Sequence, residues 1–155
     1  MSAGEFFTVL LRSDGKAIAC GESDFDQCDF PVLEEGMSYT QVSAGHVHTV
    51  LLRSDGMAVA CGANDFGKCE VPPLDPGLFY TQVSAGRLHT VLLRNDGQAV
   101  ACGSESLSQR NLRCYWGGKQ PSIRSVSAGR RSDTRPIFDW ATARSNCNCF
   151  LCEKQ

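Results

Sequence analysis

The sequence predicts an all-β protein, a partial β-propeller of about three four-stranded antiparallel blades with an irregular C-terminal tail. Three observations predict this class. The tripeptide Ser-Ala-Gly recurs at 2–4, 43–45, 84–86 and 127–129, at spacings of 41, 41 and 43 residues. Short apolar, β-favouring runs flank Asp-Gly turns, and no segment shows the sustained period of an amphipathic helix. A repeat of about 40 to 45 residues is the period of a propeller blade.

The repeats extend well beyond the tripeptide. Residues 2–42 and 43–83 are identical at 25 of 41 positions, and residues 43–62 and 84–103 at 16 of 20. A single β-sandwich would not repeat its sequence at this interval. We therefore divide the chain into propeller repeats and a tail. The repeats occupy 1–129, as units 2–42, 43–83 and 84–126 with a degenerate restart at 127, and the basic, cysteine-containing tail occupies 130–155.

Each unit is expected to contain a tight hairpin. In the second unit the apolar runs 49–53 and 57–61 are joined by Ser-Asp-Gly. Asp-Gly is favoured in such turns because both residues tolerate positive φ. A third strand is expected at 80–84. A fourth is expected near 69–72, at a sheet edge because it contains a proline.

Charge is distributed unevenly along the chain. The formal net charge is −2, yet residues 1–103 carry 6 Lys and Arg against 13 Asp and Glu, and residues 104–155 carry 9 against 4. An acidic repeat body argues against nucleic acid as a partner. No apolar run approaches the roughly 18 residues of a membrane span, and the first apolar run lacks a preceding basic segment. We expect no membrane association and an intracellular location, cytoplasmic or nuclear.

The repeat resembles that of the regulator-of-chromosome-condensation family. The resemblance rests on residues 42–67, which read Val-Ser-Ala-Gly-x-x-His-Thr-Val-Leu-Leu-x-x-Asp-Gly-x-Ala-x-Ala-x-Gly-x-Asn-x-x-Gly. It covers 2–103 strongly and fades towards 129. It implies a seven-bladed β-propeller, whereas only three units are clear. Because three blades leave two open faces, two explanations stay open: a fragment of a longer propeller, or self-association of identical chains through open blade faces.

The cysteines depart from the family pattern. The family usually places an aromatic residue where this chain has Cys20, Cys61 and Cys102, and often leucine where it has Cys28 and Cys69. The eight-residue spacing within the first two units is compatible with a disulfide or metal pair. We interpret these thiols instead as small packed apolar groups.

The tail holds the most metal-like group. Three thiols stand at Cys147, Cys149 and Cys152, but zinc requires four ligands in tetrahedral geometry and no fourth stands nearby. We therefore favour free thiols, and expect no metal and no cofactor.

The repeated histidines and aspartates are interpreted structurally. His48 and His89 precede the repeated threonine, and the first unit has Phe7 at that position. Since phenylalanine cannot replace a base or a ligand, we expect partly buried histidines that hydrogen-bond within their own blade. The repeated aspartates are turn residues, and no nucleotide-binding loop or catalytic set stands out. We expect no enzymatic activity.

The dipeptide after each Ser-Ala-Gly varies while the surrounding framework is constant. Two variable positions in a fixed framework predict a solvent-facing turn at one rim, which is the candidate partner-binding surface. Neutral variation on an exposed turn is the alternative. The three dipeptides are Glu5-Phe6, His46-Val47 and Arg87-Leu88.

These features favour a non-enzymatic protein–protein interaction module, whose acidic body suits a basic partner surface or a small GTPase. The resemblance implies two alternatives: guanine-nucleotide exchange on a Ran-like small GTPase, or the substrate-binding repeats of a HECT-type ubiquitin ligase. Exchange in that class depends on a closed ring and an inserted loop, and neither is visible here. The ligase needs a catalytic domain that does not fit within 155 residues.

Overall fold

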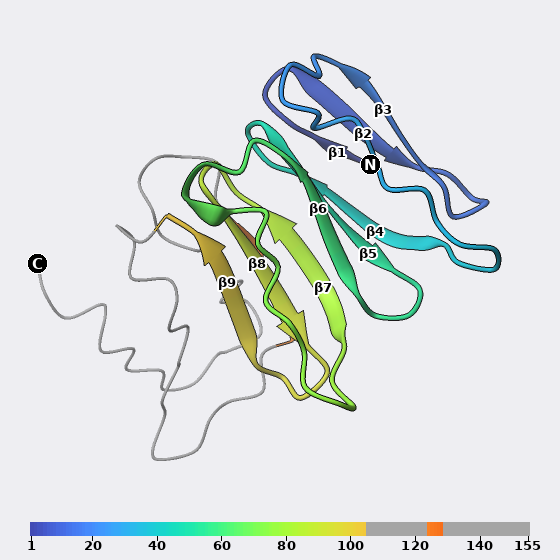
Figure 1. The fold of residues 1–155 in the computed structure, drawn as a ribbon, viewed down its shortest axis with the longest axis vertical. Coiled ribbons are helices and arrows are strands. Elements are labelled where there is room, and N and C mark those ends of the chain that lie inside the picture. Colours follow the sequence, from blue (N-terminus) through green and yellow to red (C-terminus); the bar gives the residue numbers. More distant parts are fainter. Residues whose placement is uncertain (105–123, 129–155) are drawn as a thin grey trace, which may run out of the picture.

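The repeats fold into three-stranded antiparallel sheets that lie side by side in chain order (Figure 1). The computed structural model describes residues 1–104 and 124–128. We call the three sheets blade one, blade two and blade three. Blade one comprises β1 (Ser2–Ala3), β2 (Phe7–Leu11) and β3 (Ala17–Gly21); blade two comprises β4 (Tyr39–Ala44), β5 (His48–Arg53) and β6 (Ala58–Gly62); blade three comprises β7 (Tyr80–Ala85), β8 (His89–Arg94) and β9 (Ala99–Gly103). A short 3-10 helix, η1 (Asp65–Gly67), follows β6.

The predicted hairpins are confirmed. In blade two, Gly56 has a φ of 80° and donates its N–H to the Arg53 carbonyl at 3.0 Å. Asp55 does not adopt positive φ as expected; its Oδ1 accepts the Met57 N–H at 3.0 Å and its Oδ2 pairs with the Arg53 guanidinium at 2.7 Å. The aspartate therefore closes the turn by hydrogen bonding. Both bonds recur in the other blades, at Asp14 and Asp96.

The expectation of four strands per blade is wrong for the described residues, where every sheet has three. The segment near 69–72, expected as the fourth strand, makes local turn bonds and contains prolines, which have no N–H to donate to a ladder. Val71 from this segment packs into the core between blades two and three. The Tyr80 hydroxyl donates to the Pro72 carbonyl at 2.8 Å, which fixes the segment across the blade.

The strand expected at 80–84 is present as β7, but it pairs with the hairpin that follows it. Its register runs from Tyr80 opposite Arg94 to Ala85 opposite Thr90. The register shifts between Tyr80 and Gln82, which marks a β-bulge that the sequence did not reveal. Each folded blade therefore straddles the Ser-Ala-Gly tripeptide.

Hydrogen bonds from side chains link each first strand to the next blade. β4 and β7 are edge strands of their sheets, so one row of their N–H groups lacks ladder partners. Gln41 Oε1 accepts the Val83 N–H at 3.0 Å, and Ser43 Oγ accepts the Ala85 N–H at 2.9 Å. The repeated serine thus satisfies a backbone donor on the neighbouring blade.

The same link recurs at both ends of the described chain. Ser2 Oγ accepts the Ala44 N–H at 2.9 Å. Residues 124–128 lie against β7 as β7 lies against β4, because Gln82 and Ser84 accept two N–H groups of this segment. The donors are Val126, at 3.2 Å, and Ala128, at 2.8 Å.

Apolar side chains fill the space between successive blades. The larger cluster, between blades two and three, buries valine, leucine, alanine and tyrosine side chains; its buried members are Val50, Leu52, Ala58, Tyr80, Val83, Ala85 and Leu92. The smaller cluster, between blades one and two, buries Phe7, Val9 and Ala44. The core therefore lies between the blades, and each blade is stabilised by its neighbour. No helix in residues 1–104 and 124–128 is long and apolar enough to cross a membrane.

His48 is wholly buried and bonds to the next blade, so the expectation of partial burial and a partner within its own blade is wrong. Its Nε2 lies 3.0 Å from Thr90 Oγ1, and the Thr90 hydroxyl donates to the Lys68 carbonyl at 2.8 Å. The imidazole is therefore the donor to Thr90. The bond crosses between blades because the His48 side chain points towards blade three and the Thr90 side chain points towards blade two. Burial, with a contribution from Lys68, lowers the pKa of His48 to about 3.

Because His48 is buried, we expect the free energy of unfolding to fall as the pH is lowered. The unfolded chain protonates this imidazole near its ordinary pKa of about 6.5, whereas the folded chain resists protonation, so unfolding takes up a proton below that pH. The free energy of unfolding should drop by roughly 1 kcal/mol per pH unit below about pH 6 from this residue. Urea denaturation across this pH range measures it.

His48→Phe is the matched variant, because phenylalanine occupies the equivalent position 7 of the first repeat. Its stability should depend less steeply on pH than that of the wild type, whatever its stability at neutral pH. Equal slopes for the two proteins would show that His48 does not control the acid response.

Candidate partner-binding rim

The three variable dipeptides form the tips of equivalent tight turns at one end of the blades. Each turn joins the first strand of a blade to the second, and the preceding glycine donates its N–H across it. Gly45 donates to the His48 carbonyl at 2.8 Å, and the other two turns have matching bonds at 2.7 and 2.9 Å. The structure therefore places all six residues predicted from the sequence on the same rim.

Backbone hydrogen bonds stack the three turns on one another. The Glu5 N–H donates to the His46 carbonyl, and the His46 N–H donates to the Gly86 carbonyl, each at 3.3 Å. This approach requires glycine at position 45, because a Cβ there would lie 2.5 Å from the Gly86 oxygen. Gly45 thus allows blades two and three to approach at the rim.

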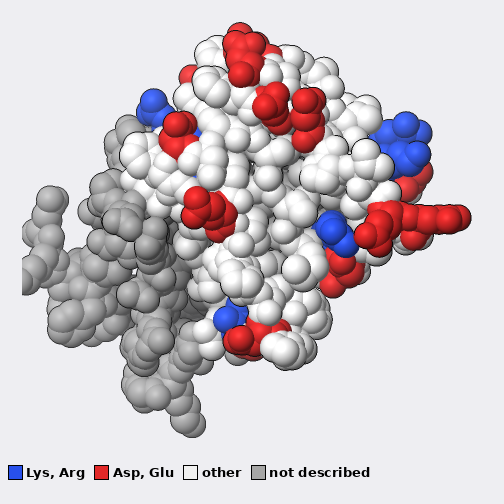
Figure 2. All heavy atoms as spheres, in the orientation of Figure 1, with Lys and Arg blue, Asp and Glu red and all other residues white. Residues whose placement is uncertain are grey.

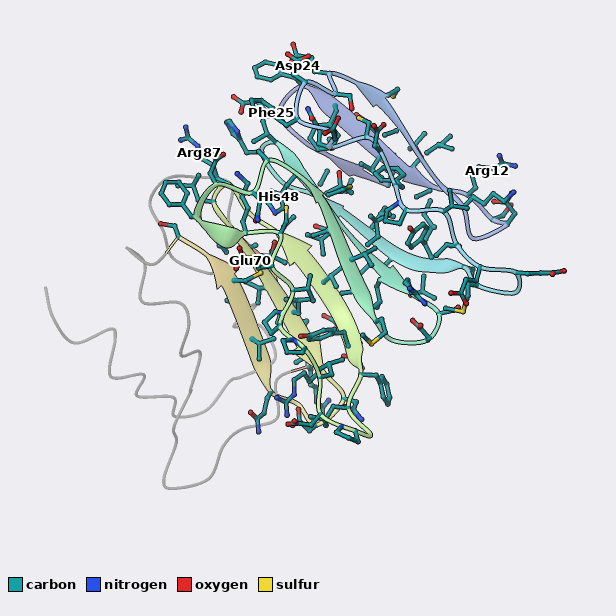
Figure 3. All side chains as sticks on the ribbon, in the orientation of Figure 1. Arg12, Asp24, Phe25, His48, Glu70 and Arg87 are labelled. Atoms are coloured by element: carbon teal, nitrogen blue, oxygen red, sulfur yellow. The ribbon has the colours of Figure 1, made fainter. Side chains whose placement is uncertain are left out.

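The first residue of each dipeptide contributes to one shared hollow. The hollow has a volume of about 290 Å³ and is lined by Gly4, Glu5, Gly45, His46 and Arg87. Glu5 Oε2 forms an ion pair with His46 Nε2. An acid, an imidazole and a guanidinium therefore follow one another across three blades, and Figure 3 shows Arg87 at this end of the molecule. Such a row can pair with both charges of a complementary surface.

The second residue of each dipeptide is apolar and lies outside the lining of the hollow. Phe6 is 58 % exposed, whereas Val47 and Leu88 are half-buried. The carbonyls of Val47 and Leu88 accept the N–H groups of Ala63 and Ser104, which hold the loop after each hairpin against the turn. These two residues therefore support the rim, and Phe6 extends from it.

Sequence reasoning missed two loops at this same end. They follow β3 and β6, and their tips carry Phe25 and Phe66, which are 53 % and 63 % exposed. The available signal was the Asp-Phe dipeptide, which occurs at 24–25 and again at 65–66. The repeat places both phenylalanines at equivalent positions in their loops. Because each ring is more than half exposed, neither fills the core.

The cysteines of the described residues are free thiols. Burial raises the pKa of Cys61 to about 12 and that of Cys102 to about 11, so both stay protonated and unreactive. The expectation that Cys20 packs in the core is wrong, because Cys20 is exposed on β3, the last strand of blade one. Within residues 1–104 and 124–128, no three His, Cys, Asp or Glu side chains form a group that could hold a metal.

The metal candidates Cys147, Cys149 and Cys152 lie outside the described residues, as does the whole of the segment 130–155.

Comparison with known repeats identifies the framework. Residues 39–68 and 80–109 match the sequence profile of the regulator of chromosome condensation (RCC1) repeat. These two segments are therefore similar to regulator-of-chromosome-condensation repeats. Each match begins at the first residue of β4 or β7 and covers the hairpin that follows; the first match ends just after η1. The start of the profile therefore coincides with the start of the folded blade.

Solved structures confirm a partial β-propeller fold. Saccharomyces cerevisiae Prp20p, described with its binding to Gsp1p and histones, matches with a TM-score of 0.64 and 21% identity over 82% of this chain and 40% of that one. Human WBSCR16 matches with a TM-score of 0.67 and 19% identity over 83% of this chain and 43% of that one. The chain thus spans about two fifths of these structures. Among curated proteins, none matches.

The close approach at Gly45 predicts a large cost for adding a methyl group there. Gly45→Ala should lower the free energy of unfolding by more than about 2 kcal/mol, because the new Cβ overlaps both the Gly86 carbonyl and the His48 ring. Urea denaturation followed by circular dichroism measures the loss. Gly36→Ala is the control, since Gly36 has a φ of 82° but no atom within 4 Å of its added Cβ. Gly36→Ala therefore carries only the cost of a positive φ, which Gly45 does not have. If Gly45→Ala loses no more stability than Gly36→Ala, contact between the turns does not explain the requirement for glycine.

Proposed function

We propose that this chain is a non-enzymatic protein–protein interaction module whose partner binds at the rim. The observation that carries the proposal is the shared hollow, where side chains from three blades gather although they are more than eighty residues apart in sequence. The residues proposed to contact the partner are Glu5, Phe6, His46, Val47, Arg87 and Leu88.

The division between constant and variable positions supports this role. The constant residues have identifiable structural functions: Ser43 bonds to the next blade, Gly45 permits the turns to stack, and Asp55 closes the hairpin. The backbone of the turn tips has structural roles, but their side chains have no such function in common, and they combine opposite charges with an exposed aromatic ring. Aromatic residues and arginine, both present at these tips, are enriched in interfaces between proteins.

A small GTPase is the partner class that one comparison favours. The yeast protein with the same fold is described as binding Gsp1p and histones. Guanine-nucleotide exchange by this chain is therefore the second candidate function. A nucleotide-release assay with a Ran-like GTPase separates the two functions: accelerated release supports exchange, whereas binding without acceleration supports interaction alone.

Charge reversal at the rim should abolish capture of the partner. Arg87→Glu adds a second acidic group to the row that holds Glu5 and reverses the charge at its end, so a surface complementary to the wild type is repelled. Quantitative affinity capture from an extract of the source cells, with wild type and variant compared by isotope labelling, measures the effect. We expect at least about a tenfold loss of the specific partner.

Arg12→Glu is the matched control, because Arg12 lies in a hairpin turn at the opposite end of blade one and is paired with Asp14 in the same way as its repeat equivalents. Capture by this variant should equal that of the wild type. Retention of the partner by both Arg87→Glu and Glu5→Arg would remove the rim as its binding site.

A further inference from the structure

The loops after β3 and β6 lie beside the rim turns. β3 ends opposite Phe7 and β6 ends opposite His48, so both loops start where the rim turns end. The first loop is tied to its turn by the Glu22 N–H, which donates to the Phe6 carbonyl at 3.0 Å. Figure 3 shows Phe25 and Asp24 at the same end of the molecule as Arg87. The tips of these loops and the rim therefore share one surface.

Each loop holds its phenylalanine outward on a firmly anchored backbone. Gln27 and Lys68, near the ends of the loops, are only 2 % and 1 % exposed. Their carbonyls accept the hydroxyls of Thr49 and Thr90 on the next blade, at 2.7 and 2.8 Å. The anchors are buried between blades, so the exposed tips are not free to fold their rings back into a core.

The second loop also restrains the backbone at the ring itself. Phe66 has a φ of 65°, a left-handed conformation that is rare for an aromatic residue. Asn64 maintains it by accepting the Gly67 N–H on its carbonyl at 3.0 Å and the Cys69 N–H on its Oδ1 at 2.9 Å. With Phe6, three phenylalanines that are each more than half exposed stand at this end of the blades.

Exposed carboxylates surround these rings. Asp24 and Asp26 flank Phe25, and Asp65 precedes Phe66. In the described residues Asp24 and Asp26 have no ion pair, and Asp65 pairs only with Lys68. Figure 2 shows acidic side chains over this end, and a second acidic group at the opposite end on the right of the view.

The turn aspartates at the opposite end of the blades are paired locally with arginines. There each turn aspartate is paired with an arginine two residues before it. The pairs are Arg12–Asp14, Arg53–Asp55 and Arg94–Asp96. The carboxylates of Asp24 and Asp26 beside Phe25 differ from these turn aspartates, because within the described residues no arginine or lysine forms an ion pair with them.

We propose that this aromatic–acidic surface, made by Phe6, Phe25, Phe66, Asp24, Asp26 and Asp65, binds an arginine-containing peptide segment of a protein partner. A planar guanidinium can stack on an exposed phenyl ring and donate to a neighbouring carboxylate at once. An ammonium group makes a point contact only, so arginine is the cation that fits both parts of the surface. The inference rests on the proposed interaction function and adds the chemistry of the partner.

Fluorescence anisotropy of the full chain with a labelled peptide of alternating arginine and glycine tests the proposal. We expect saturable binding by the wild type and weaker binding of the matched lysine–glycine peptide. The double variant Phe25→Leu with Phe66→Leu keeps apolar side chains but removes the ring faces, and should weaken binding of the arginine peptide about tenfold. Asp24→Asn with Asp26→Asn should weaken it by a similar factor and reduce its dependence on salt.

Controls at the opposite end of the blades separate this surface from general charge attraction. Phe79→Leu alters an exposed phenylalanine beside the hairpin turn of blade two, and Glu34→Gln with Glu35→Gln removes two exposed carboxylates near the turn of blade one. Both controls should bind as the wild type does.

Three results would overturn the proposal. These are absence of saturable binding by the wild type, unchanged affinity in the Phe25→Leu with Phe66→Leu variant, or equal losses in the controls. If any of these is found while Arg87→Glu still loses the captured partner, the chain remains an interaction module with a partner of different chemistry.

Discussion

The hydrogen bonds that Gln41 and Ser43 make to the Val83 and Ala85 N–H groups are the interaction on which the rest of the structure depends. The first strand of each blade is a sheet edge, and an edge strand must satisfy its outward N–H groups or leave them open to other chains. Here the preceding blade supplies side-chain acceptors. The repetition of this serine therefore has a physical cause, because an acceptor must stand opposite the outward N–H of each following first strand.

This constraint also explains where the chain can vary. Serine and glutamine link the first strands, the apolar residues of β5 and β8 fill the gap between sheets, and Gly45 allows the turns to stack. The side chains at the tips of the turns and of the loops after the hairpins have no such role. They include the row Glu5, His46 and Arg87 and the exposed phenylalanines beside it, all at one end of the blades.

Features that arise within one blade could be predicted from the sequence, whereas features that depend on contacts between blades could not. The hairpins followed from Asp-Gly between apolar runs, since that signal is contained within one blade. The bond from His48 to Thr90 could not be predicted in the same way, because its partner lies forty-two residues away on another blade. The prediction of a fourth strand was wrong because the segment near Pro72 forms its backbone hydrogen bonds locally. Its apolar side chains pack between the blades.

The candidate site likewise combines residues that the sequence predicted with residues that only the structure reveals. The variable dipeptides were recognised because they interrupt a constant framework, and the structure places them together. Phe25 and Phe66 went unnoticed because they are themselves part of the repeated pattern, and a repeated apolar residue suggests a core position. Only the geometry of the loop, with Phe66 at a φ of 65° above the buried Lys68, shows that the repeated ring faces outward.

Native-state amide hydrogen exchange at Val83 and Ala85 tests the central claim most directly. Neither N–H bonds to a strand of its own sheet, so any protection must come from Gln41 and Ser43. The account predicts that both amides exchange slowly, and that Ser43→Ala accelerates exchange at Ala85 while the amides of the β8–β9 hairpin keep their protection. Rapid exchange at both amides in the wild-type chain would contradict it.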